Sequence, residues 1–271
     1  MSIVVNTNIG SLNAQRSLAE SSRELSTAME RLSSGKKINS AADDAAGFAI
    51  AERMTAQVRG LNMATKNAND GLAMLATIEN ATNDVTDMLQ RIRELAVQAA
   101  NDTNGAQDRT YLQTEVDSLV AEINRVSTDT VYNDSVVLDG NLSGSLQVGT
   151  ASGQTIDFAI TSIDTTTLGV DALDLSDATN AATALTAIDS AIETVAGNRA
   201  GYGALSNRLE YTVSNLMNVA EFTTAARSRI EDADFAAESA RLAKAQVLQQ
   251  TGTAMLAQAN ASSQLAIQLI R

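Results

Sequence analysis

Both ends of this 271-residue chain carry residues that repeat every seven positions, and this repeat limits the possible folds more than any other feature. In the segment 11–33 a stripe of small residues runs beside a stripe of leucines; the members are Ala14, Ser21 and Ala28, and Leu18, Leu25 and Leu32. A strict seven-residue repeat is typical of helices that supercoil around a partner, and small residues let the two backbones approach closely. The pattern predicts a helix that pairs with another helix.

The segment of about 238–270 repeats this design over four heptads. Its small stripe consists of Ala245, Gly252, Ala259 and Ala266, and its partner stripe consists of Leu248, Met255, Ser262 and Leu269. Because the two ends share one pattern, we predict that they coil together into a terminal two-helix coiled coil. The alternative is that each helix packs separately on a globular core.

The distribution of charge also distinguishes the two ends from the middle. Residues 1–40 and 235–271 each carry a net charge of +2, whereas the whole chain carries −13. Binding of nucleic acid is not expected, because it needs clustered basic residues.

No apolar run is long enough to insert into a membrane. The first residues show neither the basic leader nor the apolar run of a signal peptide, so a standard secretory route is not expected.

The middle of the chain has the pattern of three long helices. Apolar residues recur in three- and four-residue steps from position 45 to about 100, and Gly60 and Gly71 are candidate bends in this first helix. A turn at 101–105 precedes a second helix, and a third begins near Asp177, a suitable N-cap. Three helices with one apolar stripe each predict an elongated bundle.

Residues of about 131–175 differ, because short β-type runs are separated by Gly, Asp, Ser and Thr. They predict a small antiparallel β region. The expected fold is therefore mainly α. Its predicted parts are residues 1–40, residues 41–234 with the β region, and residues 235–271, and the segments 33–40 and 225–234 are expected to connect them.

The composition argues against catalysis. The chain has no His and no Cys, which excludes catalytic triads, thiol nucleophiles and the usual ligands of zinc and haem. The acidic groups at Asp43–Asp44 and at 231–234 lack the spacing of a calcium loop, so they are interpreted as capping or solvated acids. We therefore expect no enzyme activity, no cofactor and no metal site.

Several multi-residue motifs in sequence order closely resemble bacterial flagellin. Near the amino end they occupy residues 6–8, 30–35, 38–41, 43–47, 67–71 and 90–97, and near the carboxy end residues 226–232, 248–250 and 257–260. The resemblance covers nearly the whole chain. Larger flagellins insert variable outer domains between these regions, and residues 131–176 leave no room for them, so the chain resembles a short form.

The resemblance implies a structural subunit that polymerises with itself into the helical filament of the bacterial flagellum. It implies the flagellar type III export apparatus, a secretion chaperone, and cap and hook-associated proteins as partners, with a secreted, extracellular location. It also implies recognition by an animal Toll-like receptor, through Arg91, Leu95 and Glu122. Two alternatives are a hook-associated filament-junction protein, which shares the terminal coiled coil, and a helical signalling rod, which would need membrane spans.

Overall fold

The computed structural model describes residues 7–268 and the side chains of residues 7–262. Backbone contacts separate two compact units. The terminal unit contains the described residues up to 56 and those from 222 onward, and the middle unit contains residues 57–221. Each unit is described by itself below.

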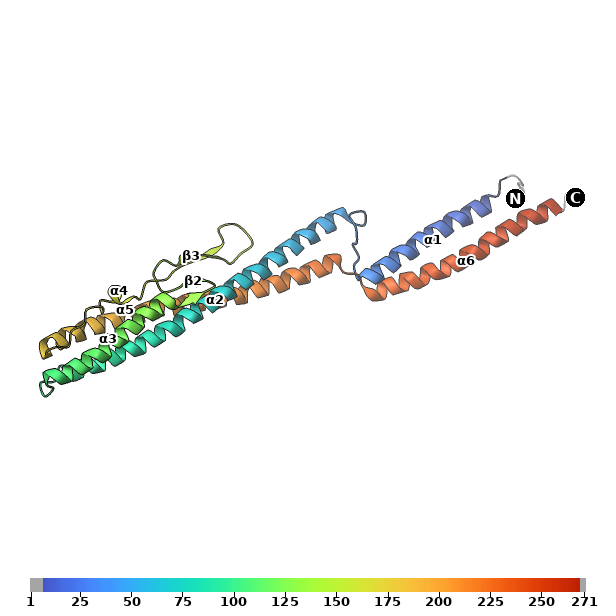
Figure 1. The fold of residues 1–271 in the computed structure, drawn as a ribbon. Helices are drawn as coiled ribbons and strands as arrows, with labels where there is room; N and C mark the ends of the chain where they lie inside the picture. The colour runs from blue at the N-terminus through green and yellow to red at the C-terminus, as the bar shows by residue number, and fades with distance from the viewer. Residues whose placement is uncertain (1–6, 269–271) are drawn as a thin grey trace. The chain divides into compact units, whose positions relative to one another are not determined.

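The two helices at the chain ends form the main part of the terminal unit. Helix α1 (Ile9–Ser34) begins at the N-cap Asn8, whose side chain accepts from the Ser11 amide, and ends at Gly35 in the left-handed conformation, φ 71°. Helix α6 (Phe235–Gln268) lies beside it (Figure 1). The predicted mainly helical fold and the pairing of the chain ends are confirmed.

The middle unit is a bundle built from three helices, also confirmed from the sequence pattern. They are α2 (Ala45–Ala99), α3 (Ala106–Asp129) and α5 (Ala178–Glu231), with the outer ends of α2 and α5 belonging to the terminal unit. Fully buried branched residues from all three helices form one continuous core. They include Ile78, Leu89, Ile92, Val116, Ile123, Ile188 and Leu209.

Two small antiparallel hairpins and one short helix make up the predicted β region. Strands β1 (Val131–Tyr132) and β2 (Ser135–Val136) are joined by two residues with positive φ, Asn133 at 48° and Asp134 at 64°. These angles fit the tight hairpin turn that matches strand twist. Strands β3 (Ser143–Gln147) and β4 (Thr155–Ala159) form the second hairpin, and α4 (Thr165–Leu168) follows. The sequence pattern did not predict α4.

Gly60 and Gly71 allow the second hairpin to lie close to α2. A Cβ atom on Gly60 would stand 2.8 Å from Thr150 Cγ2, and one on Gly71 would collide with Leu146 Cδ1. The Asn67 side chain donates from Nδ2 to the carbonyl oxygen of Gln147 at 3.0 Å, between these two contacts. Helix α2 continues through both glycines, so their role is close approach of the strands.

The returning connector is shorter than expected. Residues 225–234 were predicted to lie outside the helices, but α5 continues to Glu231 and only 232–234 separate it from α6. The alternating charges explain the difference, because Arg227 and Glu231 are one helical turn apart and form an ion pair at 3.8 Å.

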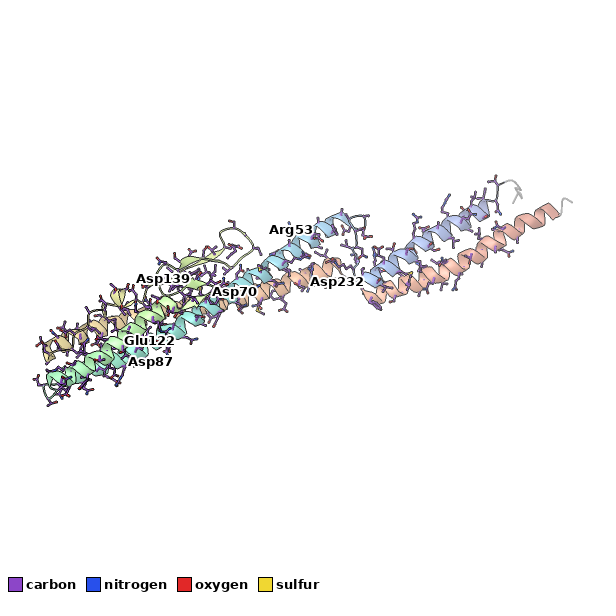
Figure 2. The ribbon with its side chains drawn as sticks, viewed as in Figure 1. Arg53, Asp70, Asp87, Glu122, Asp139 and Asp232 are labelled. Atoms are coloured by element: carbon purple, nitrogen blue, oxygen red, sulfur yellow. The ribbon has the colours of Figure 1, made fainter. Side chains whose placement is uncertain are left out.

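The acidic charge lies in the middle unit. This unit has eight basic and 22 acidic residues, against 11 and 10 in the rest of the chain. The middle-unit acids Asp70, Asp87, Glu122 and Asp139 are labelled in Figure 2. Among the described residues, no helix is long and apolar enough to cross a membrane.

Candidate assembly surface

Helices α1 and α6 pack against each other as an antiparallel pair, which we call the terminal helix pair. At one end Asn8 Nδ2 donates to the carbonyl oxygen of Ala259 at 2.8 Å. At the other end Arg31 Nη1 lies 3.1 Å from Glu238 Oε1. The pair therefore extends over more than 20 residues of each helix.

In α1, the residues of both predicted stripes are less exposed than most other residues of the helix. Ser21 and Ala28 are buried, and Ala14 is half-buried. The three leucines of the large stripe, Leu18, Leu25 and Leu32, are also half-buried. A methyl group on Gly252 would contact Leu18, so this stripe faces α6.

Only one of the two predicted stripes of α6 lies inside the pair. Ala245 is buried, and Gly252 and Ala259 are half-buried. Leu248 and Met255, which were predicted to form the partner stripe, are 43% and 65% exposed, and Ser262 is exposed. The second set of less exposed positions consists of Leu242, Gln249 and Leu256.

The sequence repeat could not decide which side of the α6 small stripe turns inward. A bulkier residue stands three positions before and three positions after each of Ala245, Gly252 and Ala259. Both flanks have the same spacing, and only packing against α1 distinguishes them. The predicted members Ala266, as a side chain, and Leu269 lie outside the described residues.

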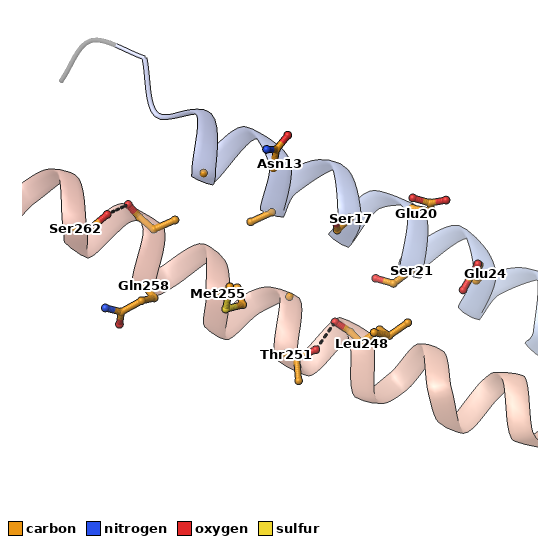
Figure 3. Close-up of a pocket in the computed structure, with 14 residues that line it drawn as sticks. Asn13, Ser17, Glu20, Ser21, Glu24, Leu248, Thr251, Met255, Gln258 and Ser262 are labelled. Atoms are coloured by element: carbon orange, nitrogen blue, oxygen red, sulfur yellow. Dashed lines mark hydrogen bonds between the residues drawn. The ribbon is translucent and has the colours of Figure 1, made fainter. Parts of the chain in front are cut away.

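A groove of about 680 Å³ runs between the two helices (Figure 3). Leu248 and Met255 line it from α6, together with Gly252. From α1 it is lined mainly by small and polar residues, including Ala14 and Ser17. Large apolar side chains at the rim of a groove with small residues form a surface that can receive side chains of another helix.

A carboxylate with two guanidinium partners lies at the other end of the pair. Glu238 is 5% exposed, and its Oε1 accepts from Arg31 Nη1 at 3.1 Å and from Arg241 Nη1 at 3.0 Å. Arg31 Nε is buried and has no hydrogen-bond partner. A buried ion pair is costly to desolvate, so the polar groups at this position need a specific explanation.

The connectors that join α1 to α2 and α5 to α6 are held together by backbone bonds and ion pairs. The Ala233 amide donates to the carbonyl oxygen of Gly35 at 3.0 Å, and the Lys37 amide donates to that of Glu231 at 2.7 Å. The Lys36 ammonium pairs with the Glu231 carboxylate.

The acidic groups singled out in the sequence act as caps in these connectors. Asp43 Oδ2 accepts from the amides of Ser40 and Asn39 at 2.9 and 3.0 Å, and these bonds hold the pKa of the Asp43 carboxyl below its usual value. Asp44 and Asp234 accept from backbone amides in the first turns of α2 and α6. The described residues contain no cluster of acids that could hold a metal ion.

The residues suggested for receptor recognition do not share one surface. Arg91 is exposed and pairs with Glu94 and Glu115, both at 2.9 Å, which raises its pKa. Leu95 is only 2% exposed and belongs to the bundle core, so it does not lie on the surface beside Arg91. Helical spacing places Leu95 with Ile92 on the inward face.

Glu122 is an exposed residue of α3 (Figure 2). Its carboxylate is bound by the Arg125 guanidinium at 2.6 Å, which lowers the pKa of Glu122.

Family models match most of this chain. Residues 5–143 match the bacterial flagellin N-terminal helical region, and residues 185–270 match the bacterial flagellin C-terminal helical region. The chain belongs to the bacterial flagellin family. This family is structural and is not an enzyme family, which agrees with the lack of catalytic motifs in the sequence.

Full-length flagellins align along nearly all of the chain. A flagellin of Halalkalibacterium halodurans is 43% identical, covering 99% of this chain and all of the relative. The flagellar filament 33 kDa core protein of Treponema phagedenis is 39% identical with the same coverage. A crystal structure of Bacillus cereus flagellin has a TM-score of 0.50 and 30% identity, covering 56% of this chain and 88% of that one. The sequence predicts a short flagellin, and the Halalkalibacterium halodurans flagellin is also short, because the alignment that covers all of it spans 272 residues.

Proposed function

We propose that this chain is a subunit of a bacterial flagellar filament and that the terminal helix pair carries contacts between its copies. The observation that carries the proposal is the apolar surface that pairing leaves uncovered. Leu12 and Met29 of α1 are 54% and 56% exposed, and Val247, Leu248 and Met255 of α6 are also exposed. Leu248 and Met255 line the groove, and exposed apolar residues of this kind are typical of an interaction surface.

A helical filament follows when the contacts between copies are of the head-to-tail kind. Such a contact joins two different surfaces of the same protein, and it generates an open polymer when the rotation between copies does not close a ring. The groove and the exposed residues Leu12 and Met29 provide different surfaces on one helix pair. A relative with 39% identity is named as a core protein of the flagellar filament.

Membership of the family also supports the partners and the location of the filament. We propose export through the flagellar type III apparatus with a secretion chaperone, growth beneath a cap protein, and attachment to hook-associated proteins. The location is then the extracellular filament. A role as a hook-associated junction protein is not favoured, because both family models and the full-length relatives are flagellins or filament proteins.

Removal of α6 tests the proposal directly. Electron microscopy of the purified full-length chain should show helical filaments, whereas a chain lacking residues 236–271 should remain dispersed. Circular dichroism should show that the truncated chain stays largely helical, because the core of the middle unit lies within residues 57–221. Filament growth by the truncated chain would overturn the role assigned to the terminal helix pair.

A further inference from the structure

The terminal helix pair has a nearly repetitive seam. Leu18 faces Gly252, and a shift of one heptad would place Leu18 against Ala245 or Ala259 instead. All three are small residues, so the packing of Leu18 changes little between these three registers. Seams with uniform steric properties specify register poorly, and a polar residue at one position is a well-attested means of fixing it.

Glu238 is the residue of the seam that does not tolerate such a shift. In the observed register its carboxylate meets Arg31. A shift of seven residues along α1 in one direction brings Glu238 opposite Glu24, and in the other direction opposite Ile38, beyond the end of α1. The first alternative places two like charges together, and the second removes the α1 partner of a buried carboxylate.

We propose that Glu238, through Arg31, selects the register and the partner of α1 in the terminal helix pair. Arg241 supports the carboxylate from the same helix one turn away and moves with it, so it does not discriminate between registers. The discrimination comes from α1, where Arg31 attracts the carboxylate and Glu24 repels it. The pairing lies within one chain, so this inference goes beyond the proposed filament role.

The burial of this pair indicates specificity more than stability, because removing the Glu238 carboxylate from water is costly. Breaking a buried pair is strongly destabilising, whereas replacing it by apolar residues is often neutral. Such a pair rejects wrong arrangements by the charge that each of them leaves unpaired.

The connectors offer a competing explanation, because they lie at the same end of the pair. The bond from the Ala233 amide to the Gly35 carbonyl also opposes a shift of the two helices. The two explanations differ in what neutral substitution of Glu238 does. The connectors remain intact in that variant, so they would hold the register if they were sufficient.

Cysteine pairs can report the register because the chain has no cysteine of its own. A Cβ on Gly10 would lie 3.8 Å from the Ala259 Cβ, which suits a disulfide, so Gly10→Cys with Ala259→Cys reports the observed register. Ser17 occupies the position seven residues further along α1. Ser17→Cys with Ala259→Cys therefore reports the shifted register that places Glu238 opposite Ile38, and disulfide-linked dimers of the chain report pairing with a wrong copy.

The full-length chain should first be tested with Glu238 intact. Mild oxidation, followed by electrophoresis and peptide mass spectrometry, should then close the Gly10–Ala259 bond and leave the Ser17 reporter and the dimers at low yield. Failure of the Gly10–Ala259 bond to close would overturn the proposal. Filament growth is scored separately by electron microscopy, so this failure is distinguishable from failure of the proposed function.

Glu238→Gln should raise the ratio of shifted and dimeric products to the native product by about tenfold or more, because a shifted register then no longer buries an unpaired carboxylate. Arg31→Lys should keep the native product, since it retains the cation. Glu30→Gln is the matched control, because Glu30 is the exposed neighbour of Arg31 and should leave all ratios unchanged. An unchanged ratio in Glu238→Gln would overturn the proposal and assign the register to the connectors.

Discussion

Leu18 of α1 lies directly against Gly252 of α6, where a methyl group would stand 3.4 Å from Leu18 Cδ1 and 3.9 Å from its Cβ. This space accepts an alanine at ordinary contact distance but not a branched side chain. The small residue on α6 and the leucine on α1 are therefore complementary in size. The close approach of the two helices at this level depends on that complementarity.

Gly252→Leu should overpack the terminal helix pair at about 1–3 kcal/mol and block filament growth, whereas Gly252→Ala should permit it. Electron microscopy and thermal unfolding measure the two effects. Gly203→Leu is a suitable control, because a Cβ at Gly203 meets no atom within 4 Å, and a leucine there favours the helix. Normal filaments from Gly252→Leu would contradict the packing described here.

Leu248→Ser combined with Met255→Ser should prevent assembly and leave the helix content of the chain unchanged. Both side chains are exposed at the rim of the groove, so the pair itself does not depend on them. Sedimentation and circular dichroism separate these outcomes. Ala243→Ser with Ala257→Ser adds the same two hydroxyl groups at exposed positions of α6 and should assemble normally. Equal loss of assembly in both double variants would show that the rim is not the contact.

Gly71→Ala should destabilise the middle unit by up to about 2 kcal/mol, because the collision of the added methyl group with Leu146 of the second hairpin outweighs the helix gain of about 1 kcal/mol. Urea denaturation of the chain measures this change. Gly203→Ala should have the opposite sign and stabilise α5 by about 1 kcal/mol, since Gly203 makes no close approach. A stabilising Gly71→Ala would mean that the hairpin does not lie on α2 at this glycine.

Leu95→Ala should lower the free energy of unfolding by about 2–5 kcal/mol, because it leaves a cavity in the bundle core. Arg91→Ala should cost no more than about 1 kcal/mol, since the Arg91 ion pairs are exposed. Thermal unfolding of the two variants distinguishes them. Similar, small losses for both would place Leu95 on the surface.

Acidification should loosen the turn that Asp43 closes. Its folded-state pKa is lowered from 3.8 by the amides of Ser40 and Asn39, so the contribution of Asp43 is complete above 3.8 and is lost as the pH falls through the lower value. The Asn39 and Ser40 amide resonances should titrate together in NMR spectra, with a midpoint below 3.8. In Asp43→Asn this titration should disappear. A midpoint above 3.8 would contradict the hydrogen bonds.

The helices and their approximate ends could be predicted from the sequence because they depend on local patterns. The three-helix stripes of the middle unit, the Asp177 start of α5 and the β region between 131 and 175 all follow from spacing, capping and turn residues. The extension of α5 to Glu231 was missed, because the charged run around Arg227 was interpreted as a connector and not as i,i+4 pairing.

The pairing of the two chain ends can be predicted from sequence, since each end carries the same seven-residue repeat of small and large residues. The flank of the α6 stripe that turns toward α1 depends on packing between the helices, which leaves Leu248 and Met255 at the rim. Tertiary packing also decides that Leu95 is buried and that Gly60 and Gly71 receive a hairpin. A periodic pattern defines the spacing of a face, but its direction depends on contacts with residues distant in the chain.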